Sequence, residues 1–169
     1  MEENILMSEN LTRTTFCTLL NEKKESLYRL AYMYVKNQQD ALDIVHESIY
    51  KAYTSFEKLK EPKYFNTWLT RIVINCALDH IRKNNKIAFL KGNSLFEPSW
   101  EINSDEHIDL YNAIDKLNGN LKTVVILKYF QDMTIESIAE LLDCPVSTVK
   151  NNLHKALKYL RLQLMEDEF

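Results

Sequence analysis

The apolar positions of this chain repeat at helical spacing. Between residues 25 and 35 they follow the i, i+3, i+4, i+7 rule of an amphipathic helix at Leu27, Leu30, Ala31 and Tyr34. No stretch of useful length alternates apolar and polar residues, as a half-buried strand would. The chain has only two glycines and three prolines. We therefore predict an all-α fold.

Two further amphipathic helices are predicted in the first half of the chain. We expect residues 1–20 to fray, and residues 36–39 to form a break before a second helix that Asp40 caps. The expected buried face of this second helix comprises Ala41, Ile44, Val45, Ile49, Ala52, Tyr53 and Phe56. A loop around residues 60–63 precedes a third helix at about residues 64–83. Its expected buried face comprises Phe65, Trp68, Leu69, Ile72, Val73, Cys76, Ala77 and Ile81. Three helices with matched apolar faces make one small domain.

Helical periodicity fails after this domain and returns near residue 107. Gly92, Pro98 and several polar residues interrupt the intervening segment, which favours a flexible linker. Further helices are predicted at about 107–117, 121–130, 134–142 and 146–164, with Gly119 and Pro145 at breaks. For a chain of 169 residues, two small domains are a reasonable size. The predicted organisation is a flexible N-terminus at 1–15, a domain at 16–84, a linker at 85–106, a domain at 107–164 and a tail at 165–169.

The stretch TIESIAELLDCPVSTVKNNLHKAL has the pattern of a helix-turn-helix. Thr134 is a good N-cap for its first helix, and the small Ala139 would let a second helix cross closely. Asp143 lies where the turn needs a residue that tolerates a left-handed conformation, and Pro145 then begins the next helix. The expected buried residues of the first helix are Ile135, Ile138 and Leu142.

The second helix of this motif has a polar face that suits the DNA major groove. Short polar side chains can hydrogen-bond to base edges while flanking cations contact phosphates. Residues 147–162 contain no Asp or Glu, which favours nucleic-acid binding over an ordinary solvated face. The expected inward residues are Val146, Val149, Leu153, Ala156, Leu157 and Leu160. The expected outward residues are Ser147, Lys150, Asn151, His154, Lys155 and Lys158.

Charge and composition restrict the alternatives. The formal net charge is −3, so DNA binding requires that the basic residues be segregated, because Lys and Arg supply nonspecific affinity. The cysteines, Cys17, Cys76 and Cys144, are widely scattered and indicate neither a disulfide framework nor a CxxC zinc site. No stretch approaches the roughly 18 apolar residues of a membrane span, so we expect a cytoplasmic protein without stable membrane insertion.

Together with DALDIVHESIYKAY and NTWLTRIVINCALDHIRK upstream, the helix-turn-helix resembles the extracytoplasmic-function (ECF) branch of the sigma-70 family. The resemblance covers nearly the whole chain, from about residue 16 to residue 164. It implies that residues 16–84 correspond to region 2 and residues 107–164 to region 4. It also implies a noncatalytic RNA polymerase sigma factor, needing no cofactor or metal, that directs core polymerase to promoters and assists their opening.

An acidic stripe on the second helix is the candidate polymerase-binding surface. Asp40, Asp43 and Glu47 are spaced i, i+3, i+7. The resemblance implies that this helix docks on the clamp of the largest polymerase subunit through Asp40, Asp43, Ile44, Val45 and Glu47. His46 stands where the family commonly has Gln, and its titration would make core binding mildly pH-sensitive. The resemblance also implies contact with the polymerase flap region and an anti-sigma factor as a further partner.

The resemblance assigns two surfaces to promoter DNA. We expect the third helix to expose a stripe comprising Arg71, Asn75, Leu78 and Arg82. This stripe, together with the loop at residues 55–64, would read the proximal element and receive a flipped nontemplate base. Its candidate residues are Lys58, Lys60, Tyr64, Arg71, Asn75 and Arg82. The distal element would be read by Ser147, Lys150, Asn151, Asn152, His154, Lys155 and Lys158. We expect Lys155 to contact a base and Lys158 a phosphate, and we expect Trp68 to pack in the core.

Two other classes of protein would share some of these features. A one-component helix-turn-helix repressor would bind its operator as a homodimer without polymerase, and would usually enclose an apolar ligand pocket. A metal-dependent enzyme or sensor would use Cys76 and His80, which are spaced i, i+4. Two ligands do not make a metal site, and Cys76 falls on the predicted core face.

Overall fold

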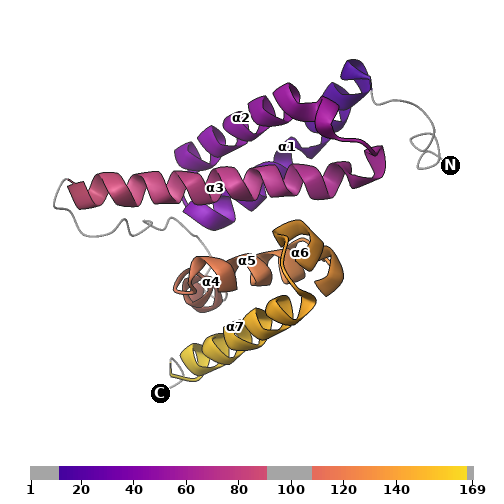
Figure 1. Cartoon of the computed structure of the whole chain (residues 1–169). Coiled ribbons are helices and arrows are strands. Elements are labelled where there is room, and N and C mark those ends of the chain that lie inside the picture. The colour runs from indigo at the N-terminus through magenta and orange to yellow at the C-terminus, as the bar shows by residue number, and fades with distance from the viewer. Residues whose placement is uncertain (1–11, 91–107, 167–169) are drawn as a thin grey trace. The chain divides into compact units, whose positions relative to one another are not determined.

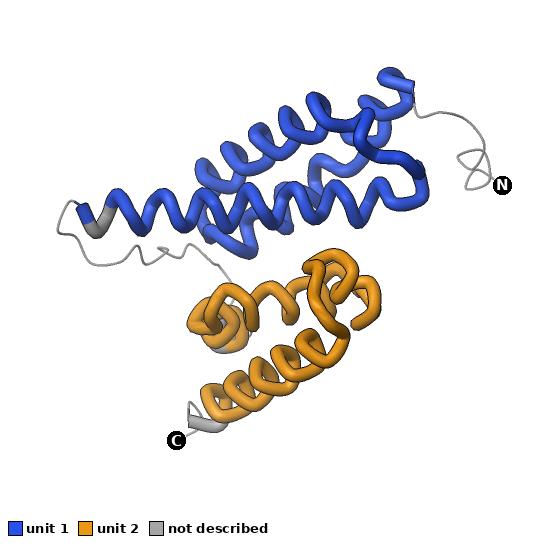
Figure 2. Tube along the Cα trace, in the orientation of Figure 1, with its two compact units in different colours: residues 1–100 blue, residues 101–169 orange. Residues whose placement is uncertain are grey.

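The computed structural model describes residues 12–90 and 108–166, and every regular element in these ranges is helical. The chain divides into two compact units, residues 1–100 and 101–169 (Figures 1 and 2). These findings confirm the predicted all-α fold with two small helical domains. None of the helices described is long and apolar enough to cross a membrane.

Unit 1 is a three-helix domain. It contains α1 (Arg13–Val35), α2 (Gln38–Ser55) and α3 (Phe65–Leu90), and each helix packs against the other two. Two short 3₁₀ turns, η2 (Phe56–Lys58) and η3 (Pro62–Tyr64), lie between α2 and α3. The apolar faces predicted from periodicity meet in the centre of this domain, where the largest fully buried side chains are Phe16, Leu30, Ile44, Leu69, Val73, Ile74 and Cys76.

The first helix begins earlier than we predicted. The side chain of Thr12 caps it by accepting a hydrogen bond from the Thr15 amide at 3.3 Å. Phe16 is fully buried and Leu20 is 5% exposed. The prediction that residues 1–20 fray is therefore wrong for residues 13–20, while residues 1–11 lie outside the described ranges. Packing of an apolar face, more than local propensity, stabilises a helix end of this kind.

The boundary between α1 and α2 also differs from the prediction. Lys36 ends α1 in a left-handed conformation, with φ 54°, and its amide donates to the Tyr32 carbonyl at 2.8 Å. Asn37 caps α2, because its extended backbone lets Oδ1 accept from the Asp40 amide at 2.9 Å. Asp40, the predicted cap, instead lies in the first turn, where a carboxylate is favoured by the helix dipole.

Other differences concern the end of α3 and the edges of the apolar faces. No Gly or Pro interrupts residues 84–90, and α3 continues to Leu90 rather than ending near Lys83. The first residues of the predicted 85–106 linker are thus helical, and residues 91–107 lie outside the described ranges. Tyr53, predicted to be buried, is 42% exposed because it lines an open groove beside α1.

Unit 2 is built around its last helix. Its elements are α4 (Ile108–Asp115), α5 (Gly119–Val125), α6 (Ile135–Leu142) and α7 (Val146–Glu166). The helix α7 packs against the other three helices. A wider π-helical turn, η4 (Ile126–Phe130), continues α5, and the Gln131 amide donates across it to the Ile126 carbonyl at 3.2 Å.

A buried ion pair joins α4 to α5 within this unit. Lys122 Nζ lies 2.7 Å from Asp115 Oδ1, and the two side chains are only 10% and 12% exposed. The apolar core around this pair includes Val124, Ile126, Leu127, Ile138 and Val149.

Candidate functional site

The helix-turn-helix forms with the predicted turn chemistry. Thr134 Oγ1 accepts from the Ser137 amide at 3.1 Å and caps α6. Asp143 ends α6 in the left-handed region, with φ 52° and ψ 50°. The Asp143 amide donates to the Glu140 carbonyl at 3.3 Å and the Cys144 amide to the Ala139 carbonyl at 3.0 Å. This pair of bonds is the Schellman arrangement that closes many helices.

The second helix of the motif, α7, turns its apolar face inward. The Pro145 carbonyl accepts from the Thr148 amide at 2.9 Å, which starts the helix. Val149, Leu153, Ala156 and Leu160 are buried, as the spacing predicted. Leu157, which we also predicted to be inward, is 42% exposed because it lies at the edge of the apolar stripe. Val146 is half-buried at the start of the helix.

The outer face of α7 is basic. Among the residues that the structure describes, no carboxylate forms an ion pair with Lys150, Lys155 or Lys158, so their charges remain available to an anionic partner. Asn152 is half-buried and therefore less accessible than its neighbours. The exposed candidates are Ser147, Lys150, Asn151, His154, Lys155 and Lys158.

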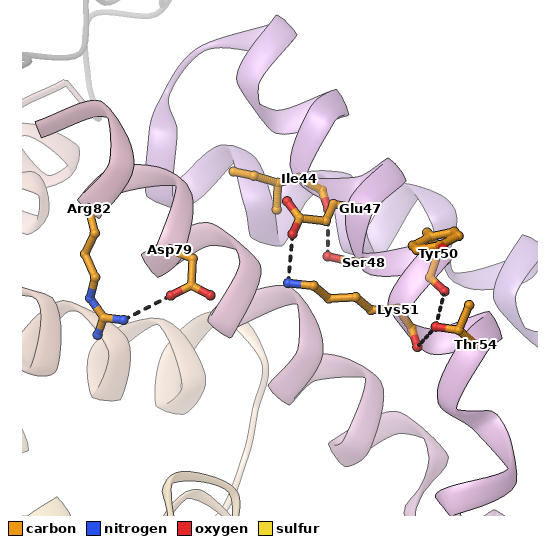
Figure 3. Close-up of polar contacts among 8 residues, drawn as sticks. All are labelled: Ile44, Glu47, Ser48, Tyr50, Lys51, Thr54, Asp79 and Arg82. Carbon is orange, nitrogen blue, oxygen red and sulfur yellow. Dashed lines mark hydrogen bonds and ion pairs between the residues drawn. The ribbon is translucent and has the colours of Figure 1, made fainter. Parts of the chain in front are cut away.

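A second candidate DNA surface lies on α3. Arg71, Asn75 and Arg82 are exposed along one side of the helix, with the half-buried Leu78 between them. Arg82 donates to Asp79 Oδ1 at 3.0 Å, as Figure 3 shows, and the two side chains are 74% and 60% exposed. A pair this open contributes little energy in water, so a phosphate could replace the aspartate.

The loop between α2 and α3 presents further candidates. Lys58 and Lys60 are exposed, and Tyr64 is 44% exposed. Lys63 Nζ lies 4.9 Å from the centre of the Tyr64 ring, and its hydrogen bond to Glu61 raises the pKa of the lysine. Trp68 packs against the rings of Phe16 and Phe65. This contact agrees with the expected core role of Trp68.

The acidic stripe of α2 is only partly on the surface. Asp43 and Glu47 are exposed, whereas the Asp40 side chain is 23% exposed and its Oδ1 lies 3.3 Å from His80 Nε2. Glu47 Oε1 lies 2.8 Å from Lys51 Nζ (Figure 3), and this hydrogen bond is the largest cause of the raised pKa of Lys51.

Two of the predicted polymerase-binding residues lie inside the domain. Ile44 is fully buried and Val45 is 5% exposed, because both side chains face the core between the helices. Beside them, the Ser48 hydroxyl donates to the Ile44 carbonyl at 2.6 Å. The structure therefore brings Asp43 and Glu47 to the surface together, but it does not bring Ile44 and Val45 there.

Sequence reasoning missed a groove between α1 and α2. It has a volume of about 390 Å³ and is mainly apolar, and Tyr50 at its rim is 69% exposed. The i, i+4, i+7 spacing of His46, Tyr50 and Tyr53 was the available signal. The lining residues are Cys17, Leu20, Asn21, Lys24, His46, Ile49, Tyr50 and Tyr53.

Cys76 and His80, the pair that a metal-dependent protein would use, do not lie together with further ligands among the described residues. Cys76 is fully buried, and His80 contacts Asp40 and Asn84. Within residues 12–90 and 108–166, no group of three or more His, Cys, Asp or Glu side chains is placed to hold a metal ion.

Comparison with known proteins shows similarity along both units. Residues 19–87 match the family model "Sigma-70 region 2", and residues 107–160 match "Sigma-70, region 4". RNA polymerase sigma factor SigV of Bacillus subtilis is 37% identical over 164 residues, covering 96% of this chain and 99% of SigV. The ECF RNA polymerase sigma factor SigW of the same organism is 29% identical over 170 residues, and the match covers 89% of this chain and 89% of SigW.

Solved structures show the same fold. The sigma factor RpoE of Bartonella quintana, crystallised with the anti-sigma factor NepR, superposes with a TM-score of 0.78 at 20% identity. The match covers 89% of this chain and 96% of that one. CnrH, in complex with the cytosolic domain of CnrY, gives a TM-score of 0.69 at 19% identity, covering 92% and 91% of the two chains.

Proposed function

The chain belongs to the sigma-70 family of RNA polymerase sigma factors, and from this premise we propose how its surfaces direct core polymerase to a promoter and help to open it. The observation that carries the proposal is the match of region 2 and region 4, in order, on separate helical units. A repressor is not favoured, because it would account for the helix-turn-helix but not for region 2. We propose a noncatalytic factor that needs no cofactor and acts in the bacterial cytoplasm, beside polymerase and the chromosome.

The first domain, residues 16–84, binds core polymerase through α2. Asp43 and Glu47 offer exposed carboxylates to a basic surface of the clamp, and Asp40 contributes from a partly covered position. Ile44 and Val45, being buried, act from beneath: they fix the rotation of α2 so that the acidic side faces outward.

The same domain reads the proximal promoter element through α3 and the preceding loop. Arg71 and Arg82 contact phosphates, and Asn75 lies between them to reach a base edge. The loop receives an unpaired nontemplate base, with Tyr64 available to stack on it and Lys58 and Lys60 to hold the backbone. Extruding a base costs about a few kcal/mol, which such contacts must offset.

The second domain, residues 107–164, reads the distal element through α7. Lys155 and Asn151 face base edges, with Ser147, Asn152 and His154 beside them, while Lys150 and Lys158 contact phosphates. Each domain alone would bind DNA weakly, since the net charge is −3 and affinity depends on phosphate neutralisation. Joining both domains in one chain on one polymerase supplies a local concentration of about millimolar order.

Other proteins should bind the same surfaces. RpoE was solved with the anti-sigma factor NepR, and CnrH with the cytosolic domain of CnrY. We propose an anti-sigma factor for this chain as well, one that covers its polymerase- and DNA-binding surfaces. The polymerase flap region is the proposed contact of the second domain.

Runoff transcription with bacterial core polymerase on a promoter library tests these roles. Asp43→Arg should abolish core binding, because it reverses the charge at the centre of the acidic side of α2. Glu22→Arg, which makes the same charge change at an exposed position of α1, is the matched control and should bind core normally.

Two α7 variants separate base reading from phosphate binding. Lys155→Ala should bind core but lose discrimination between promoters by about tenfold, the usual value of one specific base contact. Lys158→Ala should weaken all DNA sequences alike and lower the salt slope by about 0.9. Normal transcription by both Asp43→Arg and Lys155→Ala would show that these residue assignments are wrong.

A further inference from the structure

The loop that we propose captures the nontemplate strand is held at both ends by one residue of α1. Phe56 lies at the start of the loop and Phe65 follows its end, and both are buried, at 8% and 4% exposed. The ring of Phe16 lies 5.0 Å from the ring of Phe56 and 5.6 Å from that of Phe65, measured between centroids. Phe16 itself is fully buried. The two ends of the loop are therefore joined through the first turn of α1.

Arg13, three residues earlier on the same helix, holds the start of the loop from outside. Its guanidinium carbon lies 5.6 Å from the ring centroids of both Tyr53 and Phe56. Its Nη1 donates to the Tyr53 hydroxyl at 3.4 Å, and its Nη2 lies 3.7 Å from Glu57 Oε1. Each contact is weak at an exposed site, but all converge on the last turn of α2 and on η2, where the loop begins.

We propose that Arg13 and Phe16 are positioning residues for strand capture. By fixing Phe56 and Glu57, they preset the course of the loop that carries Lys58, Lys60 and Tyr64. If the loop became ordered only when DNA binds, the entropy cost of ordering it would weaken binding. A loop that is already ordered avoids this cost. This inference rests on the proposed function, and it adds α1 to the elements on which promoter opening depends.

The test compares Arg13→Ala with Arg29→Ala in the polymerase holoenzyme. The two arginines lie on the same helix, and their side chains are 64% and 65% exposed. Arg29 pairs only with Glu25 of its own helix among the contacts described, so it is a matched control. The promoter is one recovered by runoff selection. The probes are its nontemplate strand as a single-stranded oligonucleotide, and its duplex, whose opening is followed by permanganate reactivity of unpaired thymines.

We expect Arg13→Ala to bind the single strand about fivefold more weakly, which corresponds to losing one or two exposed cation–π contacts. The fraction of opened duplex should fall with it, while core binding stays unchanged. Arg13→Lys should recover most of the loss, because an ammonium can still lie over the two rings. Arg29→Ala should match the wild type. Phe16→Leu, which keeps apolar volume but removes the ring contacts, should lower single-strand binding in the same direction.

Two results would overturn the proposal. One is an Arg13→Ala holoenzyme that binds the single strand as the wild type does. The other is a loss of core binding by the same factor, which would indicate a general structural role. Failure of the proposed function itself would look different, because the wild-type protein would then give no runoff product. In that case this inference would also be wrong.

Discussion

Replacing Lys122 by methionine should destabilise the second domain without touching its DNA-binding face. Lys122 Nζ lies 2.7 Å from Asp115 Oδ1, and the side chains are 10% and 12% exposed. Removing one partner of such a pair leaves a buried charge without its counter-ion and costs about 3–5 kcal/mol. A domain of this size has a total stability of only about 3–9 kcal/mol. We therefore expect Lys122→Met to leave region 4 marginally folded.

The loss can be measured in the full chain by hydrogen exchange, because protection of α5 and α7 amides reports opening of the second unit alone. Protection there should fall by at least about a hundredfold, which corresponds to about 3 kcal/mol, while α2 amides keep wild-type protection. Adding Asp115→Leu should restore most of it, since an apolar pair of similar volume can replace a buried ion pair.

Acid should also reduce the defect of the single variant. The protonated carboxyl of Asp115 carries no charge, so burying it without the lysine costs less than burying the carboxylate, and the defect should shrink as pH falls. If Lys122→Met retains α5 protection within about fivefold of the wild type, roughly 1 kcal/mol, then the pair contributes far less than its burial indicates and this reasoning is refuted.

Three further predictions concern helix ends and one surface ion pair. Asp143→Gly should keep or raise the melting temperature, whereas Asp143→Val should lower the free energy of unfolding by about 1–2 kcal/mol and the melting temperature with it, because φ is 52° there. Equal melting of the two variants would contradict the left-handed turn. Asn37→Ala should cost about 1 kcal/mol in urea denaturation through loss of the α2 cap, and an unchanged midpoint would count against that cap. The hydrogen bond to Glu47 raises the pKa of Lys51 in the folded protein. The stability that this bond contributes is therefore complete below the ordinary lysine pKa and is lost as pH rises through the folded-state pKa. A Glu47→Gln variant should lower the Lys51 pKa in an NMR titration, and no change would disprove the coupling.

Periodicity and cap chemistry predicted much of the fold. The buried faces of α2, α3 and α7 follow local spacing, and the turn between α6 and α7 follows from Thr134 and Asp143. The start of α1 could not be predicted this way. Phe16 is held by Phe56 and Phe65, which lie far along the chain, and no local pattern records such a contact. The predicted end of α3 was too early. The apolar periodicity stops before the last residues that can continue the helix.

The candidate sites show the same division. The outward face of α7 and the stripe on α3 follow from spacing alone. Ile44 and Val45 were given two incompatible roles: periodicity placed them in the core, and family resemblance placed them at the polymerase. Their burial agrees with periodicity, which reports where a side chain points. The family resemblance concerns the segment as a whole and does not say which of its side chains are exposed.

The wide turn η4 has a consequence for insertions and deletions. A π-helical turn holds one residue more than an α-helical turn, so whatever follows it is rotated by about 100° from the course of an uninterrupted α-helix. Removing one residue within Ile126–Phe130 should tighten this turn and swing the following α6–α7 pair about the axis of α5. Relatives that differ by one residue here would therefore present the same DNA-reading side chains at a different angle, without any substitution among those side chains.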